Sequence, residues 1–230
     1  MNAGRLAWAI GAYLAGTFPS AYLVARLNRA DQVIRAACRG SSEGDAHVLI
    51  DKHVGKTWGS VAAALDVLKA FAYALAAKHL GDLPPAWLAA VGVLLVLGHS
   101  FPFYLQAMAG RGLSAASGVL LALLPLGMIV AGLIIVLGYV GRATGPASTL
   151  GFALAPLVAI VQGASGAMAA MAACIFGVIL LRRLPGTSEA AASAGWGKAL
   201  ARRLLFDSDR PSRRRARAAA DSPHERPVQP

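Results

Sequence analysis

A histidine and an arginine flank a short stretch of chain that separates two long apolar segments. His99 is followed by the helix-breaking Pro102, and Arg111 stands between Gly110 and Gly112. Glycines let backbone N–H groups approach a ligand closely, and a helix that begins after them adds the positive end of its dipole. Arginine supplies a permanent charge and two parallel donors that suit phosphate. The pattern predicts an anion-binding turn, with His99 and Arg111 as candidate catalytic residues.

A second pair of charges lies inside an apolar segment. Asp66 and Lys69 are three residues apart, so they share one face of a helix. Charges within membrane helices are costly and are usually paired or functional. Two interpretations follow: the two residues form an ion pair that orders the helix, or Lys69 faces a polar cavity and helps to hold an anion.

The remaining candidates lie in connections between apolar segments. Two serines stand in a glycine-bearing polar loop at 40–47, a lysine follows that loop, and an arginine and a serine flank the turn at 145–146. All of these side chains can bind phosphate oxygens. The full set of candidate phosphate-binding residues is Ser41, Ser42, Lys52, Lys69, Gly110, Arg111, Gly112, Arg142 and Ser148.

The composition indicates a membrane protein. Of 230 residues, 57% are hydrophobic and 14% are charged, whereas soluble domains carry about 25% charged residues. Several charge-free runs reach the roughly 20 residues that a helix needs to cross a hydrocarbon core of about 30 Å. We therefore expect an all-α, polytopic fold and no cleaved leader.

About seven transmembrane helices are expected. A kink is expected at Pro19, where the hydroxyls of Thr17 and Ser20 could bind carbonyls that the proline frees. A break is also expected near Pro125. Basic residues such as Arg26 cluster in alternate connections, which predicts an external N-terminus and a cytoplasmic C-terminus. The expected spans are 6–27, 59–78, 87–105, the two parts of 113–140, 147–161 and 166–181.

The last part of the chain differs from the rest. Residues 1–184 are expected to form the membrane domain and residues 185–230 a basic, largely disordered cytoplasmic tail, because alanine, serine, proline and arginine cannot bury a core. Residues 193–206 could form a short basic helix on anionic lipid, or the tail could simply be solvated. The net charge of +11 does not predict nucleic-acid binding, because no fold for it is indicated.

Taken in order, these motifs resemble one family, the bacterial acyl-phosphate:glycerol-3-phosphate acyltransferases of the PlsY type. Each piece alone is weak, but the ordered set is specific. Residues 16–23 resemble the family's G-S-x-P-x-x-Y-L, 66–69 its D-x-x-K-G, 98–103 its G-H-x-x-P-V, 109–112 its G-G-K-G, and 182–189 its R-L-x-x-G-x-E.

The resemblance implies seven spans in a bacterial plasma membrane, with the N-terminus outside and the motifs on the cytoplasmic face. It implies transfer of a fatty acyl group from acyl phosphate to the 1-hydroxyl of glycerol 3-phosphate, which gives lysophosphatidic acid for phospholipid synthesis. It implies no cofactor, metal or nucleotide.

The chain departs from the family pattern at several polar positions. Glu43 and Val48 stand where the G-S-G-N-x-G-A-T-N motif has asparagine, and Gly177 and Leu180 stand where H-x-x-N is expected. The motif lysine is Arg111. A non-catalytic relative that binds a phosphorylated lipid or metabolite is therefore the alternative hypothesis. A transporter is less favoured, because no inverted repeat is evident.

Overall fold

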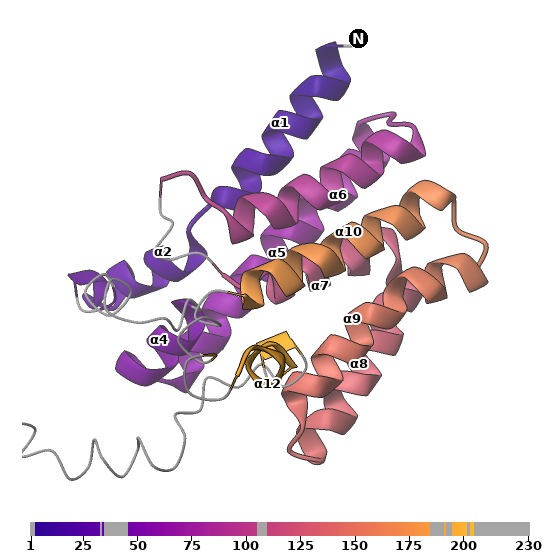
Figure 1. The fold of residues 1–230 in the computed structure, drawn as a ribbon. Coiled ribbons are helices and arrows are strands. Elements are labelled where there is room, and N and C mark those ends of the chain that lie inside the picture. The colour runs from indigo at the N-terminus through magenta and orange to yellow at the C-terminus, as the bar shows by residue number, and fades with distance from the viewer. Residues whose placement is uncertain are drawn as a thin grey trace, which may run out of the picture.

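The computed structural model describes residues 3–32, 34, 46–104, 110–184, 191, 195–201 and 203–204, leaving aside the side chains of 46–48. Within these residues all regular structure is helical, as predicted (Figure 1). The loop with Ser41 and Ser42 lies outside the described residues. Most of the tail does too, so its predicted disorder stays a prediction.

Long apolar helices form the body of the molecule. Three of them are long and apolar enough to cross a membrane, and three more are apolar but shorter. Together with the N-terminal helix they run in alternating directions along a common axis (Figure 1). The long ones are α5 (Lys56–Leu80), α9 (Thr144–Val161) and α10 (Gly166–Arg183); the others are α1 (Ala3–Thr17), α6 (Pro85–Ser100), α7 (Leu113–Leu123) and α8 (Pro125–Val140).

Prolines set the breaks between these helices. The first expected span is divided into α1 and α2 (Ser20–Leu27), with Phe18 and Pro19 between them. The Thr17 hydroxyl donates to the Leu14 carbonyl at 2.7 Å, as predicted. The Ser20 hydroxyl, which was expected to do the same, is buried and has no hydrogen-bond partner among the described residues.

Pro125 and Pro102 each end a helix by changing the backbone of the residue before them. Leu124 leaves the helical conformation before Pro125, so the predicted break is confirmed. The expected span to residue 105 was too long, because α6 ends at Ser100. Phe101 (φ −134°, ψ 62°) precedes Pro102, and a residue before proline is pushed out of the α region.

Glycines allow pairs of helices to approach closely. A Cβ on Gly16 would overlap the Leu95 carbonyl, and one on Gly98 would overlap the Tyr13 carbonyl, so α1 and α6 meet backbone to backbone. Gly118 of α7 meets Val67 of α5 in the same way. Small residues at helix interfaces are the usual means of packing helices in membranes.

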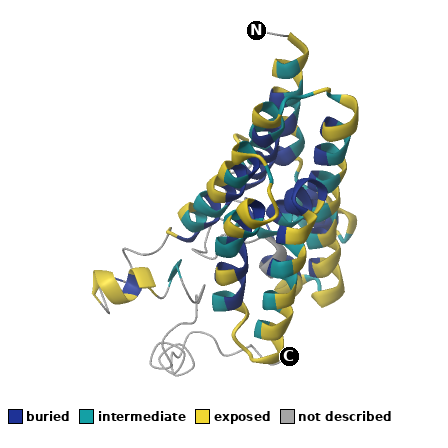
Figure 2. Cartoon of the chain, turned by 90° about the vertical axis from the view of Figure 1, so that its right-hand side faces the viewer, coloured by how far each residue is buried: buried dark blue, intermediate teal, exposed yellow. Residues whose placement is uncertain are grey.

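Buried residues face the interior of the bundle and exposed residues its outside (Figure 2). Many of the exposed residues are large and apolar. On α8, for example, Leu133, Val136 and Leu137 are more than half exposed, as expected for a lipid-facing surface. A second, smaller core joins α2, α4 (Ala46–His53) and the first turns of α5 through residues that include Val24, Ile50 and Ala62.

Candidate functional site

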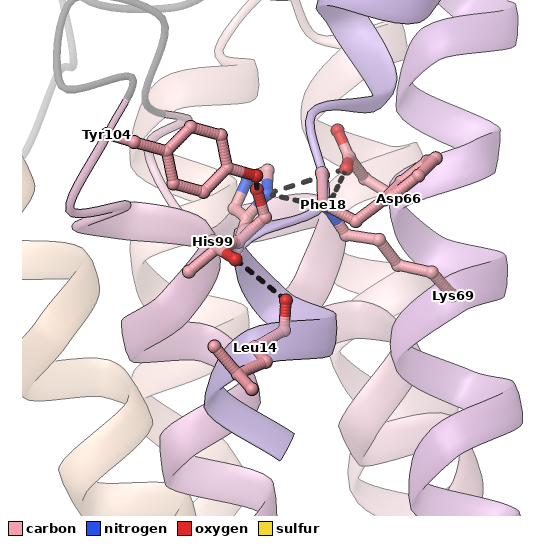
Figure 3. A network of polar contacts seen from close by, with 7 residues as sticks. Leu14, Phe18, Asp66, Lys69, His99 and Tyr104 are labelled. Atoms are coloured by element: carbon pink, nitrogen blue, oxygen red, sulfur yellow. Dashed lines mark hydrogen bonds and ion pairs between the residues drawn. The ribbon is translucent and has the colours of Figure 1, made fainter. Parts of the chain in front are cut away.

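Polar side chains gather where α6 and α10 end and where α7 and α9 begin, which we call the motif end of the bundle. Its centre is formed by three polar side chains, Asp66 and Lys69 from α5 and His99 from α6 (Figure 3). Asp66 and His99 are 2% and 8% exposed, respectively. Each therefore depends on protein groups rather than on water for its polar contacts.

Asp66 and Lys69 form an ion pair, which was the first of the two interpretations of their spacing. The Lys69 ammonium lies 2.5 Å from Asp66 Oδ1. It also donates to the Phe18 carbonyl at 2.6 Å and lies 3.5 Å from His99 Nδ1 (Figure 3). The lysine thus joins α5 to the break between α1 and α2 and to the end of α6.

His99 lies in the last turn of α6, between α5 and the turn that precedes α7. Its Nδ1 is 3.5 Å from Asp66 Oδ1. On the other side of the ring, a Cβ on Gly110 would overlap Nε2 and lie 2.7 Å from Cε1. Only glycine fits at position 110 without moving the ring.

Two tyrosines join the ends of α1 and α6 reciprocally. Tyr13 of α1 donates to the Phe101 carbonyl at 2.8 Å. Tyr104, labelled in Figure 3, donates to the Thr17 carbonyl at 2.8 Å. Both carbonyls lie at helix ends, where the helix supplies no donor of its own. The two helix ends therefore hold each other in place.

Arg111 is half-buried between the two glycines of the predicted turn. Gly112 has φ +88° and stands directly before the first residue of α7, so this position requires the left-handed conformation that glycine adopts freely. The Arg182 Nε donates to the Gly110 carbonyl at 3.2 Å, and its guanidinium lies 5.3 Å from the centre of the Phe101 ring.

Arg183 forms a second buried cluster with the beginning of α9. Its guanidinium donates to the hydroxyls of Ser148, at 3.3 Å, and Thr149, and to the Leu204 carbonyl at 2.8 Å. The Ser148 hydroxyl donates in turn to the Gly145 carbonyl at 2.8 Å. Leu204 follows the short helix α12 (Trp196–Ala201), so the chain beyond α10 returns to the motif end.

The sequence candidates thus fall into separate groups. Lys69, His99 and Gly110 are in one cluster, and Arg111 and Gly112 continue from it. Ser148 belongs to the Arg183 cluster. Arg142 is exposed in the turn between α8 and α9, and Lys52 is exposed on α4.

Several residues of the site were not among the predicted ones. The contacts that hold the site together include those made by Asp66, Arg182, Arg183, Tyr104 and Thr149. The double arginine at 182–183 resembles the start of the family motif R-L-x-x-G-x-E, but the sequence assigned neither residue a place in the site. No group of three or more His, Cys, Asp or Glu side chains that could hold a metal occurs in the described part of the chain.

Comparison with known proteins assigns the family. The profile that describes glycerol-3-phosphate acyltransferases matches residues 6–188. The chain belongs to the glycerol-3-phosphate acyltransferase family. The match begins within α1, continues past the end of α10 and stops before α12, so the segment that reaches Leu204 lies outside the family region.

Individual relatives agree with this assignment. The glycerol-3-phosphate acyltransferase of Myxococcus xanthus is 33% identical over 173 residues, which are 73% of this chain and 86% of the relative. That of Trichlorobacter lovleyi is 31% identical over 186 residues, which are 79% of this chain and 91% of the relative.

Solved structures support the same fold. The crystal structure of PlsY, an integral membrane glycerol 3-phosphate acyltransferase, in its glycerol 3-phosphate form is similar with a TM-score of 0.68 and 27% identity. The aligned region covers 84% of this chain and 93% of the PlsY chain. The lysophosphatidic acid form gives a TM-score of 0.65. The chain is therefore a multi-pass membrane protein of this family.

Proposed function

We propose that the protein is a membrane acyltransferase that makes lysophosphatidic acid from acyl phosphate and glycerol 3-phosphate. The 1-hydroxyl oxygen attacks the acyl carbonyl carbon, and the bond from that carbon to the phosphate oxygen breaks. The hydroxyl proton leaves with the inorganic phosphate. The family match over residues 6–188 carries the proposal, and the anion-binding turn at the motif end agrees with it.

Because an acyl phosphate is already activated, the protein mainly positions two anions and stabilises the charge that develops. Arg111, with the backbone of Gly110 and Gly112, would hold one phosphate. His99 would orient this turn or move a proton. The second anion would be held by a subset of Ser41, Ser42, Lys52, Lys69, Arg142 and Ser148.

The direct test is turnover by the purified protein. Acyl phosphate and glycerol 3-phosphate are supplied together, and inorganic phosphate and lysophosphatidic acid are measured. We expect both products to appear in equal amounts, and Arg111→Ala to lower kcat/KM by about a hundredfold, because a charged hydrogen-bonding group contributes about 1.5–3 kcal/mol and Arg111 holds the substrate phosphate in both the ground state and the transition state. Equal rates for the wild type and this variant would contradict the assignment of Arg111, and no product from the wild type would contradict the function.

A non-catalytic role is the alternative, and the two changed polar positions on α10 favour it. Gly177 and Leu180 provide no side-chain hydrogen bond where the family has histidine and asparagine. Such a protein would bind a phosphorylated lipid or metabolite but would fail to rescue a bacterial strain that lacks its own acyltransferase. Rescue would exclude this alternative.

We further propose that the motif end faces the cytoplasm of a bacterial inner membrane, with the N-terminus outside. The basic residues near that end, such as Arg26 and Arg142, support this orientation. Single cysteines placed at Gly163 and at Arg142, in a background without the native cysteines, test it in intact cells. A membrane-impermeant thiol reagent should label position 163 and not position 142; the reverse pattern would overturn the orientation.

The tail is proposed to contact anionic lipid. Trp196 is 69% exposed on α12, and Lys198 and Arg203 lie nearby in sequence. Such a surface suits the interface of an anionic leaflet. Activity in vesicles with and without phosphatidylglycerol, compared for the full chain and a chain that ends at residue 194, should show a lipid dependence that the shortened chain loses.

A further inference from the structure

The buried acid on α5 has no role in the function proposed above, yet it lies one side chain away from the anion-binding turn. Asp66 is 2% exposed and faces both Lys69 and His99 through one oxygen, Oδ1. Because α5 is a continuous helix of 25 residues, the position of this carboxylate is set by the backbone of a rigid element. It can therefore serve as a fixed point for groups that contact it.

His99 connects this fixed point to the turn. Its Nδ1 lies 3.5 Å from Asp66 Oδ1 (Figure 3), and its opposite edge, with Nε2, lies against Gly110. A carboxylate on one ring nitrogen is the usual means by which proteins fix the orientation of an imidazole. The His99 ring thus lies between the Asp66 carboxylate on α5 and the Gly110 backbone before α7.

Gly110 is also held from the other side. The Arg182 Nε donates to its carbonyl at 3.2 Å. Two residues later, Gly112 adopts φ +88° directly before Leu113, the first residue of α7. Arg111 therefore stands between two backbone positions that are both determined by their surroundings.

We propose that Asp66 is a positioning residue for the anion-binding turn: through the His99 ring it sets the place of Gly110, and with it the backbone that carries Arg111. This inference rests on the proposed function, because it assigns Asp66 to the binding of a substrate phosphate by Arg111. Asp66 itself does not touch the substrate.

Asp66→Asn tests the proposal with little change in size. The amide keeps an oxygen at the site but removes the charge that faces Lys69 and His99. We expect the KM of one anionic substrate to rise about ten- to a hundredfold, the cost of a small misplacement, while kcat changes less, as for an interaction made equally in ground and transition states. Ser117→Ala on α7, which removes only a hydrogen bond to Leu113 of the same helix, should leave KM within about twofold of the wild type.

A double-mutant cycle tests the ring as the connection. Gly110→Ala should lower both substrate affinity and melting temperature, because the new methyl group overlaps His99. In a His99→Ala background the same change should have little further effect, since the space is open. Non-additivity of this kind indicates direct contact.

The outcomes separate the inference from the function. An active wild type with an unchanged KM in Asp66→Asn would overturn the inference and leave the function standing. Equal effects of Gly110→Ala in both backgrounds would also overturn it. If the wild type shows no turnover, the proposed function fails. Two measurements then decide the inference: the melting temperatures of the Gly110→Ala and His99→Ala double-mutant cycle, and the calorimetric affinity of Asp66→Asn for glycerol 3-phosphate.

Discussion

The ammonium group of Lys69 lies 2.6 Å from the carbonyl oxygen of Phe18, at the break between α1 and α2. The same ammonium lies 2.5 Å from the buried Asp66 carboxylate. One cation on α5 therefore neutralises a buried acid and holds the break in the first span. Both contacts would be lost together if the charge were removed.

We predict that Lys69→Met destabilises the protein by about 3–5 kcal/mol, the usual cost of leaving one partner of a buried ion pair without its counter-charge. Thermal unfolding in detergent measures this effect. Lys78→Met is the matched control on the same helix, because within the described residues the Lys78 ammonium makes a single long contact, of 3.5 Å, with the Ala122 carbonyl. Equal effects of the two changes would contradict the prediction.

The double variant Lys69→Met with Asp66→Leu should regain much of the lost stability. It removes both charges, and well-packed apolar replacements of a buried pair are often neutral. A double variant that is less stable than Lys69→Met alone would show that the acid is satisfied without the lysine.

We predict that Arg182→Lys weakens substrate binding by about tenfold. Lysine keeps the charge, but it cannot both donate from Nε to the Gly110 carbonyl and lie flat over Phe101. A hydrogen bond from a charged group contributes about 1.5–3 kcal/mol, and tenfold corresponds to about 1.4 kcal/mol. The measurement is the KM of each substrate, and a KM equal to that of the wild type would contradict the prediction.

Gly118→Ala on α7 should destabilise the protein, although alanine is usually favoured over glycine in a helix by about 0.5–1 kcal/mol. The added methyl group would overlap the Val67 carbonyl and lie 2.9 Å from the Phe71 nitrogen, and backbone atoms cannot move aside. Gly132→Ala on α8 is the control, because nothing lies within 4 Å of its added Cβ. Opposite signs of the change in melting temperature are expected for the two variants.

A chain that ends at residue 194 should lose about 1–3 kcal/mol of stability, the cost of a buried donor that loses its acceptor. The Leu204 carbonyl accepts hydrogen bonds from Arg183 and, at 3.2 Å, from Thr149. Removal of α12 and Leu204 therefore affects the contact between α9 and α10. The full chain and the shortened chain are compared by thermal unfolding, and equal melting temperatures would show that water replaces the carbonyl.

The sequence predicted those features that depend on residues close together in the chain. Proline acts on its own neighbours, so a kink at Pro19, where the structure has a full break between α1 and α2, and the break at Pro125 could be expected. Asp66 and Lys69 are one helical turn apart, so their ion pair could be expected as well. The apolar runs predicted the bundle itself.

The contacts between distant segments could not be predicted in this way. Arg182 and Gly110 are 72 residues apart, and nothing near either residue indicates the other. The exchange of hydrogen bonds by Tyr13 and Tyr104 depends on the packing of α1 against α6. The sequence pairs Asp66 with Lys69, but the relation of Asp66 to Gly110 appears only when the His99 ring is placed between them.

The shortness of α7 has a consequence for how a substrate reaches the turn. Its 11 residues extend about 16 Å at 1.5 Å per residue, roughly half of the hydrocarbon thickness of about 30 Å. Gly118 lies against Val67 and Phe71 of α5, and α5 continues from there to Lys56, so α5 reaches well beyond the first residue of α7. The backbone at Arg111 therefore lies deeper along the bundle than the first residue of α5. We predict that a lipid-borne acyl group meets its polar acceptor at this depth, within its own leaflet.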